Sequence, residues 1–142
     1  MESNKQVEVS RKLSNLLVRS AELSKSVFAE ISASQNIPVH LARAVLLLEQ
    51  PAPMNELSQK LGCDKSYITQ LADQLEVLEL IERLPGADRR TKLLSLTPTG
   101  KALRDKLAQA AGSQSPIMRS LNDEERTQLE VLLGKILTNE TI

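Results

Sequence analysis

The chain has 142 residues, 18 basic and 18 acidic side chains, one histidine and one cysteine. This is the length of one domain with a sizeable hydrophobic core. Because the charges balance, the protein has no net electrostatic field that would attract nucleic acid. Tyr67 and Phe28 are the only aromatic residues, which disfavours the base-stacking platforms of single-strand binders. A lone cysteine, with neither a signal-peptide core nor a membrane-spanning run, predicts a soluble cytoplasmic protein without a membrane partner.

Residues 7–31 are predicted to form one amphipathic helix. At ~1.5 Å per residue it would be on the order of 38 Å long, more than one small domain covers, so we expect part of its apolar face to contact a second chain. A second helix is predicted from Pro38 to about Gln50, and "PAPM" ends it. The apolar positions of the first helix are Leu13, Leu16, Leu17, Ala21, Phe28 and Ile31.

Residues 54–61 are predicted to form a short helix with Leu57 and Leu61 inward and Gly62 as its stop. Asp64 is placed to cap a longer helix. A short helix, a three-residue turn containing glycine and a longer helix form the helix-turn-helix pattern. The buried stripe of the longer helix is predicted at Ile68, Leu71, Ala72, Leu75 and Leu78.

Two short strands, "LIERL" and "TKLLSL", are predicted on either side of "PGADRR". Thr97 is expected to cap a helix that starts at Pro98 and ends near Ala111, with "GSQSP" as a linker. Asn122 and Glu125 resemble a capping box for the last helix. The apolar stripe of that helix is Leu129, Leu132, Leu133, Ile136 and Leu137.

The second helix of a helix-turn-helix presents its exposed face to the DNA major groove. Gln70 is suited to pair with adenine, and Tyr67 to contact a thymine methyl or a phosphate. Acidic residues farther along this helix would be repelled by the phosphates of DNA. The sequence therefore favours the first two turns of the helix as the part that contacts DNA. An ordinary amphipathic surface helix remains the alternative. The outward positions are Lys65, Ser66, Tyr67, Thr69, Gln70, Asp73 and Gln74.

The hairpin tip concentrates charge, with three cations in four residues at Arg89, Arg90 and Lys92. Arginine is favoured in a narrow minor groove because the negative potential is concentrated there. The tip is therefore predicted to enter a minor groove beside the recognition helix, with a solvated polar turn as the alternative. Asp88 is expected to pair with a neighbouring arginine and orient it.

The residues from Met54 to Leu103 resemble the MarR family of winged-helix transcription regulators. The resemblance is carried by "ELxxxLG", a capping aspartate, "SxxTxLxDxLExxxLIER" and "DRRxKxxxLTxxG". It implies a mainly α fold with a small β-hairpin wing, a winged helix-turn-helix with long N- and C-terminal dimerisation helices. It also implies a homodimer that reads a pseudo-palindromic operator in double-stranded DNA, typically a repressor released by a small, often phenolic, effector. In a single domain spanning 1–142, residues 1–35 and 112–142 would then form the dimer and 38–103 the DNA-binding lobe.

The resemblance also assigns roles to single residues. Arg90 is the expected minor-groove arginine and Arg89 its neighbour in the wing motif, with Lys92 beside them. Asp73 and Asp88 match acidic positions that hold arginines through salt bridges and so support the wing. The implied major-groove positions are Lys65, Ser66, Tyr67, Thr69, Gln70 and Gln74.

Two departures from the family pattern lower the expected affinity. Gln70 and Gln74 stand where many members carry arginine, and residues 54–92 hold six basic and seven acidic side chains. Because the salt dependence of DNA binding follows the number of phosphates neutralised, we expect modest affinity with a shallow salt dependence. The alternative function is a protein-interaction adaptor on the same fold with weak or no autonomous DNA binding.

Effector, redox and catalytic roles have less support. The wall expected to bind an effector, residues 39–48, contains no aromatic side chain, and Ala42 stands where family members commonly have a bulky aromatic residue. His40 is then the candidate ligand contact, with a solvent-exposed histidine as the alternative. Cys63 is expected to pack as a buried hydrophobe in the turn; a redox role near a helix N-terminus is the alternative. One histidine, one cysteine and no glycine-rich phosphate loop predict no enzyme, no cofactor and no metal site.

Overall fold

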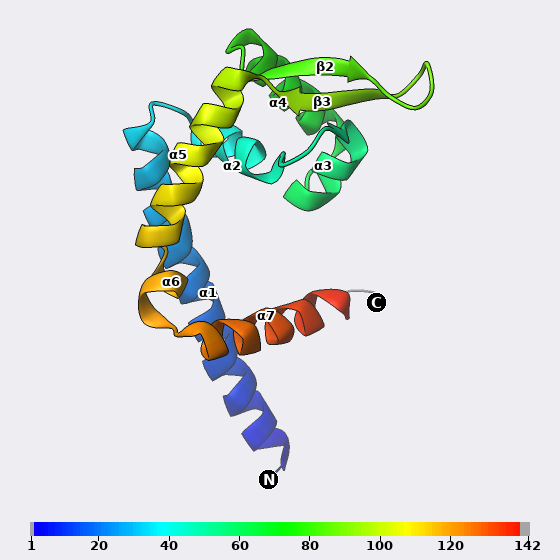
Figure 1. Cartoon of the computed structure of the whole chain (residues 1–142). Helices are drawn as coiled ribbons and strands as arrows, with labels where there is room; N and C mark the ends of the chain where they lie inside the picture. The colour runs from blue at the N-terminus through cyan, green and yellow to red at the C-terminus, as the bar shows by residue number, and fades with distance from the viewer. Residues whose placement is uncertain (1, 140–142) are drawn as a thin grey trace. The chain divides into compact units, whose positions relative to one another are not determined.

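The computed structural model describes residues 2–139 and is mainly helical (Figure 1). It divides into two compact units, each described by itself below. One comprises residues 28–111, here the central unit. The other comprises the described residues 2–27 and 112–139, here the terminal unit.

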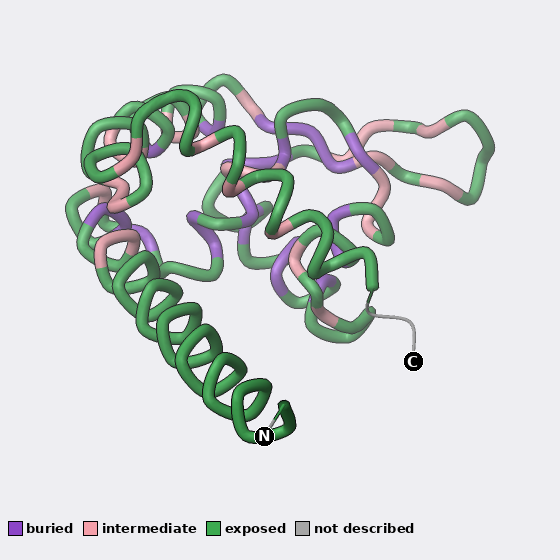
Figure 2. Tube along the Cα trace, turned by 90° about the horizontal axis from the view of Figure 1, so that it is seen from below, coloured by how far each residue is buried: buried purple, intermediate pink, exposed green. Residues whose placement is uncertain are grey.

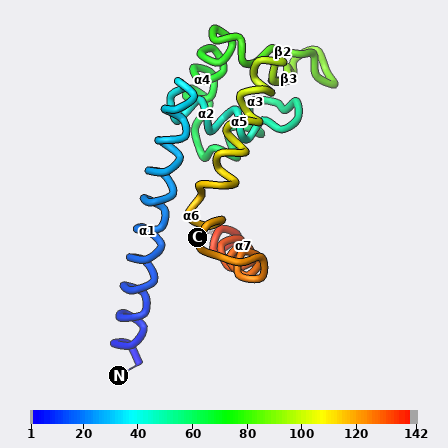
Figure 3. The backbone as a smooth tube through the Cα atoms, turned by 60° about the vertical axis from the view of Figure 1, so that its left-hand side comes forward, coloured from blue at the N-terminus to red at the C-terminus, as the bar shows by residue number. Residues whose placement is uncertain are grey.

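Three short helices and a small sheet lie in the central unit (Figures 1 and 3). Helices α2 and α3 are in contact with each other, and both contact α4. Gly62 ends α3 in the left-handed conformation at φ 68°, which glycine adopts without strain, as the sequence predicted. The helices are α2 Val39–Leu47, α3 Met54–Leu61 and α4 Lys65–Val77.

The sheet has three antiparallel strands in the order β1-β3-β2. Strands β2 (Ile81–Pro85) and β3 (Lys92–Leu96) form the predicted hairpin, whose loop extends beyond the helices of this unit (Figure 1). Strand β1 (Ala52–Pro53) pairs with β3 and was not predicted. Its two residues lie in the "PAPM" break, and only their pairing with a distant strand makes them a strand.

The core of the central unit is aliphatic, as the composition predicted. Four of the five stripe residues predicted for α4 are buried, but Leu78 is 51% exposed, so its expected burial was wrong. Leu78 is the C-cap residue, where the chain leaves the helical path and the spacing of the stripe no longer applies. The largest fully buried side chains are Leu48, Leu57, Ile68, Leu71, Leu75, Leu94, Leu107 and Val45.

Helix α5 (Pro98–Gln114) begins where the sequence predicted. The Thr97 hydroxyl oxygen accepts the N–H of Gly100 at 3.1 Å and donates to the carbonyl of Glu79 at 2.6 Å, so one side chain caps α5 and ties it to the end of α4. The helix continues through part of the expected linker, and a short helix α6 (Pro116–Ser120), which was not predicted, follows. Proline at its first position is typical of a helix start.

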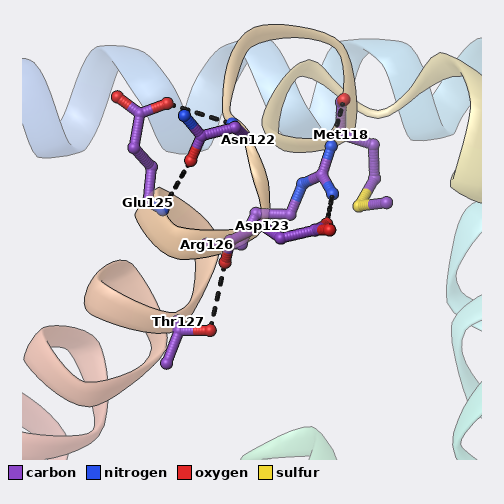
Figure 4. Close-up of polar contacts among 6 residues, drawn as sticks. All are labelled: Met118, Asn122, Asp123, Glu125, Arg126 and Thr127. Atoms are coloured by element: carbon purple, nitrogen blue, oxygen red, sulfur yellow. Dashed lines mark hydrogen bonds and ion pairs between the residues drawn. The ribbon is translucent and has the colours of Figure 1, made fainter.

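Helix α7 (Asp123–Thr138) starts with the predicted capping box (Figure 4). The Asn122 side chain accepts the Glu125 N–H at 2.9 Å, and the Glu125 carboxylate accepts the Asn122 N–H at 3.0 Å. Arg126 bonds both the Asp123 carboxylate, at 2.6 Å, and the Met118 carbonyl, at 2.9 Å. These bonds fix the turn between α6 and α7.

The terminal unit leaves its apolar side chains uncovered within one chain. Helix α1 (Glu2–Ser34) buries only Ile31 and Ser32, near its end, and α7 buries no described residue. The exposed part of α1 is a continuous green tube in Figure 2. The large exposed apolar side chains of these two helices, here the apolar faces of α1 and α7, are Val7, Val9, Leu13, Leu16, Leu17, Val18 and Leu23, and Val131, Leu132, Ile136 and Leu137.

Candidate nucleic-acid interface

Helix α4 is oriented by its cap and its buried stripe. The Asp64 carboxylate accepts the Tyr67 N–H at 2.9 Å, which satisfies one of the free donors of the first turn. Ile68, Leu71, Ala72 and Leu75 face the core. The opposite face is therefore left to solvent.

All six residues predicted to contact the major groove lie on this exposed face. Tyr67 is 42% exposed. The Thr69 hydroxyl donates to the Lys65 carbonyl at 2.9 Å, so its oxygen remains available as an acceptor. The polar surface they form, here the recognition face, comprises Lys65, Ser66, Tyr67, Thr69, Gln70 and Gln74.

The hairpin loop is closed by backbone bonds and one carboxylate. The Gly86 N–H donates to the Thr91 carbonyl at 2.7 Å. A methyl group at Gly86 would overlap that same carbonyl oxygen, so the close approach of the two strands requires glycine here. The Asp88 carboxylate accepts the N–H of Arg90 at 2.6 Å and that of Thr91 at 3.2 Å. These bonds define the shape of the loop, residues 86–91.

Asp88 therefore acts differently from the prediction. Its carboxylate was expected to orient a guanidinium, but it holds backbone N–H groups of the loop instead. Within residues 2–139, no carboxylate lies within ion-pairing distance of Arg89, Arg90 or Lys92, and all three are exposed. The hairpin tip thus presents three cations to solvent.

The wing is tied to α4 by Arg83, a residue the sequence analysis missed. Its Nη2 lies 2.7 Å from Asp73 Oδ1, and its Nε lies 3.2 Å from Glu76 Oε2. Arg83 shares the inward side of β2 with buried Ile81, because side chains two apart in a strand face the same way. The alternation of "LIERL" alone does not tell the side of Arg83 from that of Glu82, so the sequence carried no clear signal for this residue.

His40 lies in the first turn of α2 and is exposed. Its Nε2 is 3.0 Å from Gln74 Oε1, beside a surface hollow of about 230 Å³. Its predicted role as a ligand contact stays a prediction. The hollow is lined by His40, Tyr67, Gln70, Leu71 and Gln74.

Cys63 is half-buried, so the expectation of a fully buried side chain was wrong. Its carbonyl accepts the Ser58 hydroxyl at 2.6 Å, and its N–H donates to the Ser58 carbonyl at 3.1 Å. These bonds involve the backbone and explain the shape of the turn. The redox hypothesis for the thiol stays open.

The described part of the chain contains neither a metal-binding cluster nor a membrane-spanning helix. Residues 2–139 contain no group of three or more His, Cys, Asp or Glu side chains arranged to hold a metal ion. Among the same residues, no helix combines the length and the apolar character needed to cross a membrane. The recognition face and the wing remain the strongest candidate site.

Comparison with known proteins agrees with this geometry. No protein-family model matches the chain. It is similar to the HTH-type transcriptional regulator PapX of Escherichia coli, with 32% identity over 108 residues covering 73% of this chain and 66% of PapX. The chain thus spans just under two thirds of the length of this curated relative.

Solved structures match over most of both chains. Wild-type MarR from E. coli in its apo form has a TM-score of 0.69 and 25% identity, with 88% of this chain and 96% of MarR covered. A mutant E. coli MarR in complex with operator DNA has a TM-score of 0.72 and 24% identity, with 89% and 94% covered. In fold and in sequence, the chain is similar to the MarR family of winged-helix transcription regulators.

Proposed function

We propose that the protein is a sequence-specific double-stranded DNA-binding regulator, and that it acts as a homodimeric repressor released by a small molecule or another signal. The observation that carries the proposal is the pairing of a polar, exposed recognition face with a wing tip whose three cations have no carboxylate partner within residues 2–139. A related MarR has been crystallised with operator DNA.

The two parts would read different grooves. The recognition face would enter the major groove, where Gln70 and Tyr67 offer groups that bond or contact base edges. Arg90 would enter the adjacent minor groove, with Arg89 and Lys92 near phosphates. Arg83 would hold the two parts in register because it bonds α4 from strand β2.

The exposed apolar faces of α1 and α7 support the homodimer. Water-exposed aliphatic side chains cost roughly 25 cal/mol for each Å² that could be buried, and a helix of 33 residues that buries only its end leaves much of this free energy unrealised. A second copy of the chain offers the same surface, as a two-fold interface requires. Two recognition faces would then meet a pseudo-palindromic operator.

Release by an effector is the least supported part of the proposal. Residues 39–48 contain no aromatic side chain to stack on a phenolic ligand, and Ala42 is fully buried. A different ligand chemistry, or a signal other than a small molecule, would fit this segment better.

The alternative is an adaptor that binds protein and has weak or no autonomous DNA binding. The excess of acidic over basic residues in 54–92, seven to six, favours it. The intact cationic tip argues against it, because a wing without DNA contacts has no need of three exposed cations.

A gel-shift experiment with the DNA upstream of the protein's own gene separates the two functions. The regulator should shift this fragment in the presence of excess unrelated DNA. The adaptor should leave the fragment unshifted, or its complex with the fragment should be displaced by unrelated DNA at the same concentration as the fragment. A repressor should also lower transcription from this DNA in a purified system.

A further inference from the structure

His40 and Gln74 connect α2 to the recognition face. Nε2 of His40 lies 3.0 Å from Oε1 of Gln74, although the residues are 34 positions apart. Both belong to the rim of the hollow on this face, together with Tyr67 and Gln70. The contact therefore falls on the surface that the proposed function places against DNA.

The chemistry of this contact fixes which atom carries the proton. A carboxamide oxygen only accepts hydrogen bonds, so the bond requires a hydrogen on Nε2 of His40. The Nε2–H tautomer of neutral histidine and the protonated ring both supply it. The Nδ1–H tautomer does not.

The bond also decides what Gln74 offers to a ligand. In a planar carboxamide the oxygen and the nitrogen diverge from the same carbon, so an Oε1 that faces His40 leaves the NH₂ group pointing in another direction. A free glutamine pairs with adenine by accepting at oxygen and donating at nitrogen. With one lone pair of its oxygen engaged by His40, Gln74 keeps a second lone pair and presents its NH₂ group as a donor in a fixed direction.

We infer that His40 is a positioning residue that makes Gln74 a hydrogen-bond donor to the DNA, directed at an acceptor such as guanine O6 or N7, thymine O4 or a phosphate oxygen. The inference rests on the proposed function. The Gln70 side chain, one turn earlier, makes no hydrogen bond within the described residues 2–139 and keeps both its donor and its acceptor for adenine. Two glutamines on one helix would thus read different partners.

The tautomer is tested on the free protein. Because the chain has one histidine, a long-range ¹H–¹⁵N correlation spectrum contains one imidazole pattern. In alkaline buffer the Nε2–H tautomer should dominate over the Nδ1–H tautomer in the wild type. It should dominate less in Gln74→Ala. A dominant Nδ1–H form in the wild type would overturn the inference whatever the DNA result.

The role toward DNA is tested by a double-mutant cycle on binding of the upstream fragment. His40→Ala and Gln74→Ala should each weaken binding roughly three- to tenfold, and the double variant should be no weaker than Gln74→Ala alone. His40→Ala combined with Gln70→Ala is the matched control and should show additive losses. His40→Gln, which keeps a donor, should bind nearly as well as wild type, and His40→Phe, which keeps only the ring, should not.

The outcomes separate this inference from the proposed function. If the wild type binds the fragment and the binding losses of His40→Ala and Gln74→Ala are additive, His40 does not act through Gln74. The inference then fails while the proposed function stands. If wild type binds no DNA, the proposed function fails, and the inferred role with it, even where the Nε2–H tautomer is seen. Selection of binding sites from random DNA distinguishes the possible acceptors. If Gln74 contacts a base, Gln74→Ala should lose sequence preference at one base position; if Gln74 contacts a phosphate, the variant should bind all sites equally more weakly.

Discussion

The guanidinium of Arg83 on strand β2 lies 2.7 Å from the carboxylate of Asp73 on helix α4. Glu76, one turn farther along α4, binds the same guanidinium at 3.2 Å. The Arg83 side chain is 26% exposed, whereas Asp73 is 64% and Glu76 49% exposed, so solvent still screens both ion pairs. One arginine therefore fixes the angle between the wing and the recognition face, and it occupies two acids that would otherwise repel phosphate.

Replacing Arg83 with alanine tests this connection. We expect the free energy of unfolding to fall by about 1 kcal/mol, because two carboxylates lose a partly buried partner. DNA affinity should fall about tenfold, since the wing loses its orientation and two acids become unpaired. Urea unfolding and fluorescence anisotropy measure the two effects. Lys106→Ala, an equal change of charge at an exposed position of α5, should change neither; equal affinities of the two variants would contradict the connection.

Gly86 tests the shape of the wing loop. In Gly86→Ala the new methyl meets the Thr91 carbonyl, so the closing hydrogen bond between these residues should break and the loop should open. Amide hydrogen exchange should become faster at Thr91, and DNA affinity should fall. Gly112→Ala is the matched control, because its methyl meets no atom within 4 Å and lies in α5. That change should leave DNA binding intact and stabilise the helix by roughly 0.5–1 kcal/mol.

Glu79 carries a backbone conformation that suits glycine. Its φ is 60°, at the point where α4 ends and the chain turns into β2. The left-handed region costs a residue with a side chain about 1–2 kcal/mol, partly offset by the greater freedom of glycine in the unfolded chain. Glu79→Gly should therefore raise the free energy of unfolding by roughly 0.5–1 kcal/mol in urea titration. Asn36→Gly, at φ 56°, should give a smaller gain because asparagine tolerates this region; a loss of stability in Glu79→Gly would contradict the account.

The dimer is tested on the apolar face of α1. Leu17→Lys places a charge among exposed aliphatic side chains, and it should weaken association on the order of tenfold or more if a second copy covers them. Asn15→Lys adds the same charge to the polar side of the helix and should not. Sedimentation velocity over a range of concentrations gives both values. A wild-type protein that stays monomeric at all concentrations would refute the homodimer.

The local elements were predictable because their signals are local. Asp64, Gly62 and Thr97 act within one turn of their own position, and the structure has them where the sequence predicted. The Asn122 and Glu125 capping box is equally local. Strand β1 was missed because its two residues become a strand only through pairing with Leu93 and Leu94.

The candidate site was predictable by position and less so by bonding. The recognition face follows from the buried stripe of α4, so its members were correctly placed on the exposed side. Arg83 was missed and Asp88 was given the wrong partner, because ion pairs and loop bonds depend on how β2 turns back toward α4. The contact of His40 with Gln74 joins two helices far apart in sequence, and no local pattern indicates it.

Arg90 offers the most direct test of the central claim that the protein binds DNA through its wing and recognition face. Anisotropy of the labelled upstream fragment should be measured for wild type, Arg90→Ala and Lys106→Ala over a series of salt concentrations. Arg90→Ala should bind on the order of tenfold more weakly at low salt, with an unchanged sedimentation profile, and Lys106→Ala should match wild type. Wild-type affinity in Arg90→Ala would contradict the account.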